Sequence, residues 1–282
     1  MARHAVQVAR STRFDGVEAK LVFAERGQAK PYAYVEAPPA GIPRSGGDYQ
    51  ALTVPIENAR PFASELRLDV EGFAVLQRPT AVRDFWDEAQ TLAVGHPEVA
   101  QLVKAATGAV RVVVFDHTRR RRIVGVEDRS PDAPRQPASR AHVDQTVASG
   151  PQRVRDVMGA QAEDLLRRRA AIINVWRPIA HVAQDWPLAL ADARTVDAAD
   201  LIASDLIFPN RKGEIYAVAY NPHQRWLYVR DVRPDEVVLI KCWDSDPSVA
   251  RFAPHTGFED PTTPANAPPR ESIEFRTIAF FD

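Results

Sequence analysis

The sequence predicts an α+β fold that is mainly β, with a double-stranded β-helix (a jelly roll, or cupin-like barrel) as its core and helices packed on one side. Helical patterns gather in the middle of the chain, whereas the C-terminal part contains four strand-like segments separated by loops, at 214–220, 225–229, 237–243 and 272–281. Strands that follow mixed helices are typical of a β core with helices on one side. The apolar run at 110–116 predicts a strand that is buried on both faces.

Length and composition limit the class of protein. The chain has 282 residues, of which 45% are hydrophobic, which suffices for one large domain. We expect a single domain over 1–282, with N-terminal strands and helices at 1–107 and the jelly-roll core at 108–282. A formal net charge of −1 gives no reason to expect a nucleic-acid or membrane partner. The single cysteine, Cys242, and the lack of an apolar run at 1–5 favour the cytoplasm.

Residues before the apolar run alternate between short strands and helices. Apolar segments bounded by proline and glycine predict strands at 17–23, 32–35, 51–56 and 71–76. Two helices are expected within 80–107. Thr80 is a suitable N-cap for the first helix, and Pro97 suits the first turn of the second. Gly108 is expected to end the second helix.

The middle of the chain combines charged and proline-rich segments. We interpret the four arginines at 119–122 as a solvated turn at a strand end rather than an anion-binding patch. The segment 128–139 is rich in proline and lacks periodicity, so it predicts a loop. Because it leads directly into His142, it is a candidate lid. A helix is expected over 151–170, followed by a strand at 171–176.

A histidine and an aspartate in the middle of the chain form a candidate metal site. His142 and Asp144 are two residues apart, so on a strand their side chains point to the same face. His255 completes a set of two histidines and one carboxylate, the arrangement used by non-heme Fe(II) oxygenases. His223 is the alternative distal ligand. We favour His255 because it stands at the expected spacing before the final strand.

Two arginines lie at and within the final strand. The order of an H-x-D motif, a long gap, a distal histidine and an arginine is that of 2-oxoglutarate-dependent Fe(II) oxygenases. A guanidinium binds a carboxylate through two parallel charge-assisted hydrogen bonds, which lysine cannot reproduce. Arg270 and Arg276 share one strand face. Either both bracket the cosubstrate, or Arg270 binds it while Arg276 faces a substrate carboxylate or a structural acid; we favour Arg270.

Three further residues are candidates for contact with the substrate. Arg177 either holds a carboxylate of the substrate or cosubstrate, or forms a structural ion pair at a strand end. His223 lines the pocket if it is not a metal ligand. Trp176, which precedes Arg177, is the third candidate. Such residues are as often part of the packing as of a site, so the sequence leaves their roles open.

Several motifs together resemble a known family. They include AHVDQT at 141–146, NVWRP at 174–178, PHTGF at 254–258 and RESIEFR at 270–276. From about residue 31 to the C-terminus the sequence resembles the hydroxylase/desaturase family of Fe(II)/2-oxoglutarate-dependent oxygenases, which includes fungal gibberellin desaturase. Gly257 stands where the resemblance leads us to expect alanine.

The resemblance implies a specific chemistry. It implies Fe(II), the cosubstrate 2-oxoglutarate and O₂, with His142, Asp144 and His255 as the metal ligands. It also implies hydroxylation or desaturation of a small molecule in specialised metabolism, with succinate and CO₂ as products. A homodimer or a partner protein is compatible with it. The alternatives are a non-catalytic accessory subunit on the same fold, or another cupin-type metalloenzyme that does not use 2-oxoglutarate.

Overall fold

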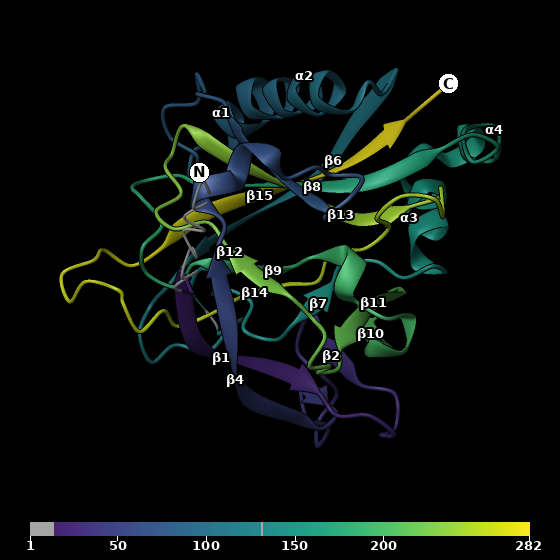
Figure 1. Ribbon diagram of the computed structural model, residues 1–282. Coiled ribbons are helices and arrows are strands. Elements are labelled where there is room, and N and C mark those ends of the chain that lie inside the picture. Colours follow the sequence, from purple (N-terminus) through teal and green to yellow (C-terminus); the bar gives the residue numbers. More distant parts are fainter. Residues whose placement is uncertain (1–13, 131) are drawn as a thin grey trace, which may run out of the picture.

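Two β-sheets face each other and enclose the core of the protein (Figure 1). The computed structural model describes residues 14–130 and 132–282, so the residues at 1–5 that were considered for a signal peptide lie outside the described part. Within the described part, the structure has no helix that combines the length and the apolar character needed to cross a membrane.

The larger sheet has ten strands in the order β1-β4-β12-β9-β14-β7-β11-β10-β2-β3. Their bounds are Gly16–Ala24 (β1), Tyr32–Tyr34 (β2), Ser45–Gly46 (β3), Tyr49–Asn58 (β4), His142–Val143 (β7), Leu188–Ala191 (β9), Leu201–Ile207 (β10), Lys212–Val218 (β11), Trp226–Tyr228 (β12) and His255–Gly257 (β14). Strands from the first 107 residues therefore pair in this sheet with strands from the rest of the chain.

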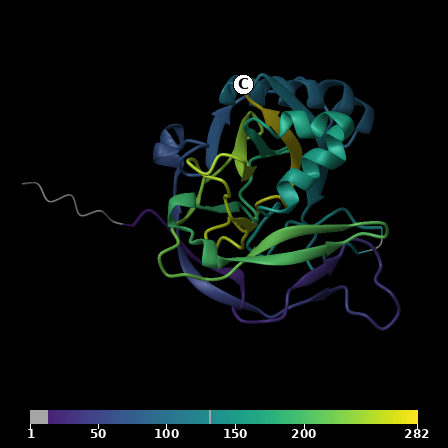
Figure 2. The same ribbon diagram turned by 90° about the vertical axis from the view of Figure 1, so that its right-hand side faces the viewer.

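The smaller sheet has five strands in the order β5-β13-β8-β15-β6. Their bounds are Phe73–Gln77 (β5), Arg111–Arg121 (β6), Ala170–Pro178 (β8), Glu236–Asp244 (β13) and Glu271–Phe280 (β15). Helices α1 (Glu88–Gln90) and α2 (His96–Thr107) cover its outer face, while α3 (Ser149–Met158) and α4 (Ala162–Leu165) lie at one end (Figures 1 and 2). The fold is thus the expected jelly-roll arrangement with helices outside the sheets.

The hydrophobic core lies between the sheets and continues beneath the helices. Every residue of β8 and β13 is buried, because these central strands are covered on both faces. Side chains from both sheets, such as Ile172, Ile240 and Leu227, pack together on the inner side. On the outer side, Val175 and Phe275 pack with α2 residues such as Val103.

Lys241 is a buried charge within β13 and is expected to matter for stability. Its side chain is 1% exposed, and its Nζ donates to Asp69 (2.7 Å) and to Asp244 (2.5 Å). We expect Lys241→Ala to lower the free energy of unfolding by about 3 kcal/mol, because it removes a partner of the fully buried Asp244. Urea denaturation followed by circular dichroism measures the change. Lys104→Ala, on the exposed side of α2, is the control, and equal effects of the two substitutions would contradict this account.

The first helix predicted within 80–107 begins later than expected. Thr80 does not cap a helix; its hydroxyl donates to Glu98 instead. Asp87 is the actual N-cap of α1, because its side chain accepts from the backbone of Gln90. The second helix has the predicted limits, with Pro97 in its first turn and Gly108 in the left-handed conformation (φ 74°) that ends it.

The apolar run at 110–116 forms a strand, but the prediction of burial on both faces was wrong. Strand β6 lies at the edge of the smaller sheet, and most of its residues are partly exposed. The expected turn at the arginine run was also wrong, because β6 continues through Arg121, paired with Glu271. Consecutive arginines fit into a strand because their side chains alternate between its two faces. Arg119 and Arg121 point outward to carboxylates, while Arg120 points inward.

Two features of the larger sheet had not been predicted. Strand β10 was missed, although it pairs antiparallel with β11 over seven residues. Strand β12 runs antiparallel to β9 on one side and parallel to β4 on the other. Strand β10 lacks a strict alternation of apolar and polar residues, and β12 and β4 are distant in the sequence. Local patterns therefore gave no signal for either feature.

Candidate metal centre

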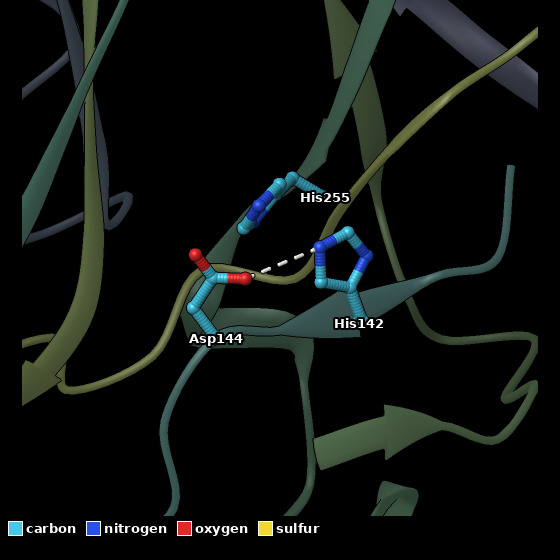
Figure 3. Close-up of side chains that lie close together, drawn as sticks. All are labelled: His142, Asp144 and His255. Atoms are coloured by element: carbon cyan, nitrogen blue, oxygen red, sulfur yellow. Dashed lines mark ion pairs between the residues drawn. The ribbon is translucent and has the colours of Figure 1, made fainter. Parts of the chain in front are cut away.

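Pairing of two short strands brings the candidate ligands together. His142 in β7 and His255 in β14 are direct cross-strand partners, and their ring centroids lie 4.5 Å apart. Asp144 follows two residues after His142 on the same side of the chain, with 3.4 Å between His142 Nε2 and Asp144 Oδ1. The three side chains point toward one another (Figure 3). One potential ligand atom from each lies within 4.8 Å of the others.

Backbone carbonyls orient both histidines. Nδ1 of His142 lies 2.8 Å from the carbonyl oxygen of Arg140, and Nδ1 of His255 lies 3.0 Å from that of Ala253. A carbonyl only accepts, so each Nδ1 carries the proton and donates. The Nε2 atoms face the centre of the group, and in the neutral imidazoles they carry the lone pairs that a metal requires.

Two side chains from the smaller sheet hold the Asp144 carboxylate from behind. Its Oδ2 accepts from Nδ2 of Asn174 (2.8 Å) and from Nε of Arg276 (3.2 Å). Burial works to raise the pKa of Asp144, but the guanidinium of Arg276 and the neighbouring His142 and His255 together outweigh burial and hold the pKa well below its usual value. The carboxylate is therefore charged at neutral pH, and Oδ1 remains directed at the histidines.

The electrostatics of the group favour a bound cation. Burial lowers the pKa of His255, assisted by the charge on His142, so His255 stays neutral with a free lone pair. At His142, burial also works against the charged form, but the neighbouring Asp144 outweighs it and raises the pKa. A site that favours positive charge next to a carboxylate also attracts a metal ion. Two imidazoles and one carboxylate on one face are the donors that suit non-heme Fe(II).

A buried guanidinium without an acidic partner lies in the same interior. Arg270 is 2% exposed, and its Nη1 donates to the carbonyl oxygen of Trp186 (2.5 Å). Its Nε has no partner, and neither does the hydroxyl of Ser272 two residues along the same face. No carboxylate of the described residues lies within 4.0 Å of this guanidinium. Burial, followed by the charge of Arg120, lowers the pKa of Arg270 to about 9. An acidic ligand would satisfy these donors.

Comparisons with known proteins agree with this geometry. A family model described as an oxidoreductase/YMDC permease-like domain matches residues 21–280. The hydroxylase/desaturase efuI of Hormonema carpetanum is 31% identical and covers 83% of this chain and 85% of its own length. The hydroxylase/desaturase CTB9 of Cercospora beticola is 34% identical, with 90% and 88% covered. The solved iron and alpha-ketoglutarate-dependent endoperoxidase NvfI has a TM-score of 0.85 at 29% identity, with 95% of this chain and 98% of its own covered.

The chain belongs to the hydroxylase/desaturase family of Fe(II)/2-oxoglutarate-dependent oxygenases. It is a dioxygenase that uses Fe(II), 2-oxoglutarate and O₂ and acts on a small molecule. The residues present fit both groups. Three converging donors suit the iron, and a buried guanidinium with an unpartnered hydroxyl beside it suits an organic dicarboxylate.

Arg276 is occupied by protein groups in this oxygenase. Besides Asp144, its guanidinium donates to Asp116 (3.1 Å), Thr118 (2.9 Å) and Glu274 (2.7 Å). Burial opposes its charge, but Glu274 and Asp144 outweigh burial and raise the pKa of Arg276. Of the two alternatives for this arginine, the contacts favour the one in which it faces structural acids.

The three residues predicted to contact the substrate do not lie together in the structure. Trp176 faces the interior, where the Cζ of Arg270 lies 5.6 Å from its ring centroid. Arg177, the next residue of the strand, points to the outer face of the sheet, away from His142, Asp144 and His255. His223 is exposed in a turn before β12 and is not part of the ligand group, whereas His255 is.

Two residues near the oxygenase centre had no role in the sequence analysis. Asn174 is fully buried and is the uncharged polar residue of an otherwise apolar run, which is a signal that could have drawn attention to it. Trp186 adopts a left-handed backbone conformation (φ 51°), which no local pattern indicates. The glycine found at position 257 in place of the expected alanine leaves room for the Trp186 side chain, because a Cβ at residue 257 would lie 2.6 Å from Cδ1 of the indole.

Proposed function

We propose that His142, Asp144 and His255 hold the Fe(II) of this oxygenase and that Arg270 binds the distal carboxylate of 2-oxoglutarate. The observation that carries the proposal is the convergence of three ligand atoms within 4.8 Å of one another. The buried, acid-free guanidinium of Arg270 supports the assignment of the cosubstrate, and Ser272 offers a hydroxyl beside it.

The residues of the chain position the reaction, while the bound groups supply the oxidation. Bound Fe(II) and 2-oxoglutarate provide, with O₂, the oxidant that removes hydrogen from an unactivated carbon, and succinate and CO₂ are released. The carbonyls of Arg140 and Ala253 keep the imidazoles in one orientation, and Asn174 and Arg276 keep the carboxylate ionised and fixed. Trp176 covers the guanidinium of Arg270 and limits its access to water.

We further propose that the substrate belongs to specialised metabolism. Relatives with such roles support this, among them the aspirochlorine biosynthesis protein N of Aspergillus oryzae, 39% identical over 46% of this chain. Names such as hydroxylase/desaturase and endoperoxidase indicate that the transformed bond differs between relatives. The single cysteine of the chain fits a cytoplasmic enzyme, and a homodimer or a partner protein is compatible with the proposal.

The proposal is tested by supplying the purified protein with Fe(II), 2-oxoglutarate and O₂ and measuring succinate. We expect succinate to form slowly without a substrate and faster when an extract of specialised metabolites contains the right one. Succinate that forms equally well in the His142→Ala, Asp144→Ala and His255→Ala variants would overturn the assignment of the ligands.

Asn174 is expected to act through Asp144. In Asn174→Ala the carboxylate loses one of two donors, so we expect the dissociation constant for Mn(II), used as a stable substitute for Fe(II), to rise by about 10- to 100-fold. Titration followed by electron paramagnetic resonance measures it. Asn221→Ala, which removes hydrogen bonds to Asp197 and Asp200, is the matched control. Unchanged Mn(II) affinity in a folded Asn174→Ala protein would contradict the role of Asn174.

A further inference from the structure

A cavity lies on the other side of the smaller sheet from His142, Asp144 and His255. It has a volume of about 520 Å³ and is open to solvent between α2 and the sheet. Helix α2 packs on β6 and β15, at one edge of the smaller sheet (Figure 1). Val175, Val237 and Phe275 form the wall on the sheet side, and Leu102 and Ala105 line it from the helix.

Strand alternation separates this cavity from the metal centre. Asn174 and Trp176 point inward, toward Asp144 and Arg270, so Val175 and Arg177 point outward. The cavity is therefore lined by a different set of side chains. A ligand that binds in it does not need the metal or the cosubstrate.

Arg177 places a positive charge in the wall of this mainly apolar cavity. The residue is 5% exposed and lines the cavity, and its Cζ lies 5.7 Å from the ring centroid of Phe85. Its Nη2 donates to the backbone carbonyls of Arg78 and Pro234. Its Nε is buried without a partner. Both hydrogen bonds come from Nη2. Because the carbonyls are neutral, they do not neutralise the positive charge of the guanidinium.

The acidic residues around Arg177 do not pair with it. No carboxylate of the described residues lies within 4.0 Å of its guanidinium. Glu98 lines the same cavity, but its carboxylate accepts from the hydroxyl of Thr80 and the backbone of Ala81. Burial lowers the pKa of Arg177, although the charges of Glu98 and Asp235 work in the opposite direction. A buried guanidinium without a paired anion is costly, and an anionic ligand would remove that cost.

We propose that this cavity is a second small-molecule site and that its ligand is an apolar monocarboxylate. The carboxylate accepts from the guanidinium of Arg177, and the hydrocarbon body lies against Val175, Val237 and Leu102. A mainly apolar cavity of this size with a few polar groups in its wall is typical of sites for small molecules. The charge of Arg177 selects an acid over the corresponding alcohol.

Isothermal titration with defined probes tests the proposal. The probes are octanoate, decanoate and 1-naphthylacetate, each compared with its alcohol. The protein is loaded with Mn(II) and 2-oxoglutarate, so that the metal centre is filled. At least one acid is expected to bind with a stoichiometry of one, about 10- to 100-fold more tightly than its alcohol, the range of a hydrogen bond to a charged group. Failure of all three acids to bind, or equal affinity of acid and alcohol, would overturn the proposal.

Two variants locate the bound acid. Arg177→Gln removes the charge, and Ala105→Trp fills the cavity from an exposed helix position while keeping the charge of Arg177. Both are expected to weaken binding at least about tenfold, whereas Arg167→Gln, on a freely exposed arginine, is expected to leave it unchanged. His142→Ala is also expected to leave it unchanged, which separates this site from the metal centre. Binding that persists in both cavity variants, or that is lost in His142→Ala, would contradict the proposal.

Discussion

Replacement of His255 by alanine is expected to lower metal affinity and succinate formation by more than about 100-fold, since loss of a residue that merely supports a metal ligand already costs about 10- to 100-fold. The variant removes one of three donors and leaves a histidine and a carboxylate, which hold Fe(II) weakly. Mn(II) titration and a succinate assay measure the two losses. The buried position of His255, 3% exposed, makes a check of folding by circular dichroism necessary.

His223→Ala is the matched control for His255→Ala. It removes the other histidine that the sequence offered as distal ligand, at an exposed position outside the ligand group. The variant is expected to keep the metal affinity of the unmodified protein. If His223→Ala lost the metal while His255→Ala retained it, the two histidines would have to exchange roles, and the cross-strand pair of His142 and His255 would not be the metal centre.

Arg270→Gln is expected to raise the dissociation constant for 2-oxoglutarate by about 10- to 100-fold, the equivalent of one hydrogen bond between charged groups. The substitution removes a buried guanidinium that has no acidic partner among the described residues, so the distal carboxylate of 2-oxoglutarate loses its counter-charge. Titration of the Mn(II)-loaded protein with 2-oxoglutarate measures this. Metal affinity should not change, because Arg270 does not hydrogen-bond to any of the three proposed ligands.

Two other arginines distinguish the role of Arg270 from a general effect of charge. Arg270→Lys keeps the charge but cannot form two parallel hydrogen bonds, so it should recover only part of the affinity. Arg177→Gln removes an equally buried guanidinium on the outer face of the sheet and should leave 2-oxoglutarate binding intact. Equal losses in Arg270→Gln and Arg177→Gln would show that the geometry of the interior does not determine where the cosubstrate binds.

Local patterns were sufficient for much of the fold. Apolar segments bounded by turn residues located strands such as β1, β4 and β13, because the pattern of apolar and polar residues within a short segment reflects which side chains are buried. They were not sufficient for the position of a strand within its sheet. The run at 110–116 resembles a central strand, but pairing with β15 alone places β6 at an edge. Sheet order depends on contacts between distant segments, which a local pattern does not contain.

The candidate site was predictable to the extent that it depended on residue type and spacing. An H-x-D motif on a strand implies two donors on one face, and the position before the last strand distinguished His255 from His223. The prediction that both Trp176 and Arg177 contact the substrate, however, conflicts with strand geometry. They are consecutive residues of one strand, so their side chains face opposite sides of the sheet and could not both contact one substrate. The supporting contacts of Asn174 and Arg276 with Asp144 cross between the two sheets and needed the structure.

A crystal structure of the protein with Mn(II) and 2-oxoglutarate, prepared without oxygen, tests the central claim most directly. We expect one ion bound by Nε2 of His142, Nε2 of His255 and the carboxylate of Asp144, with the distal carboxylate of 2-oxoglutarate on the guanidinium of Arg270. An ion bound elsewhere, or 2-oxoglutarate held away from Arg270, would contradict the account.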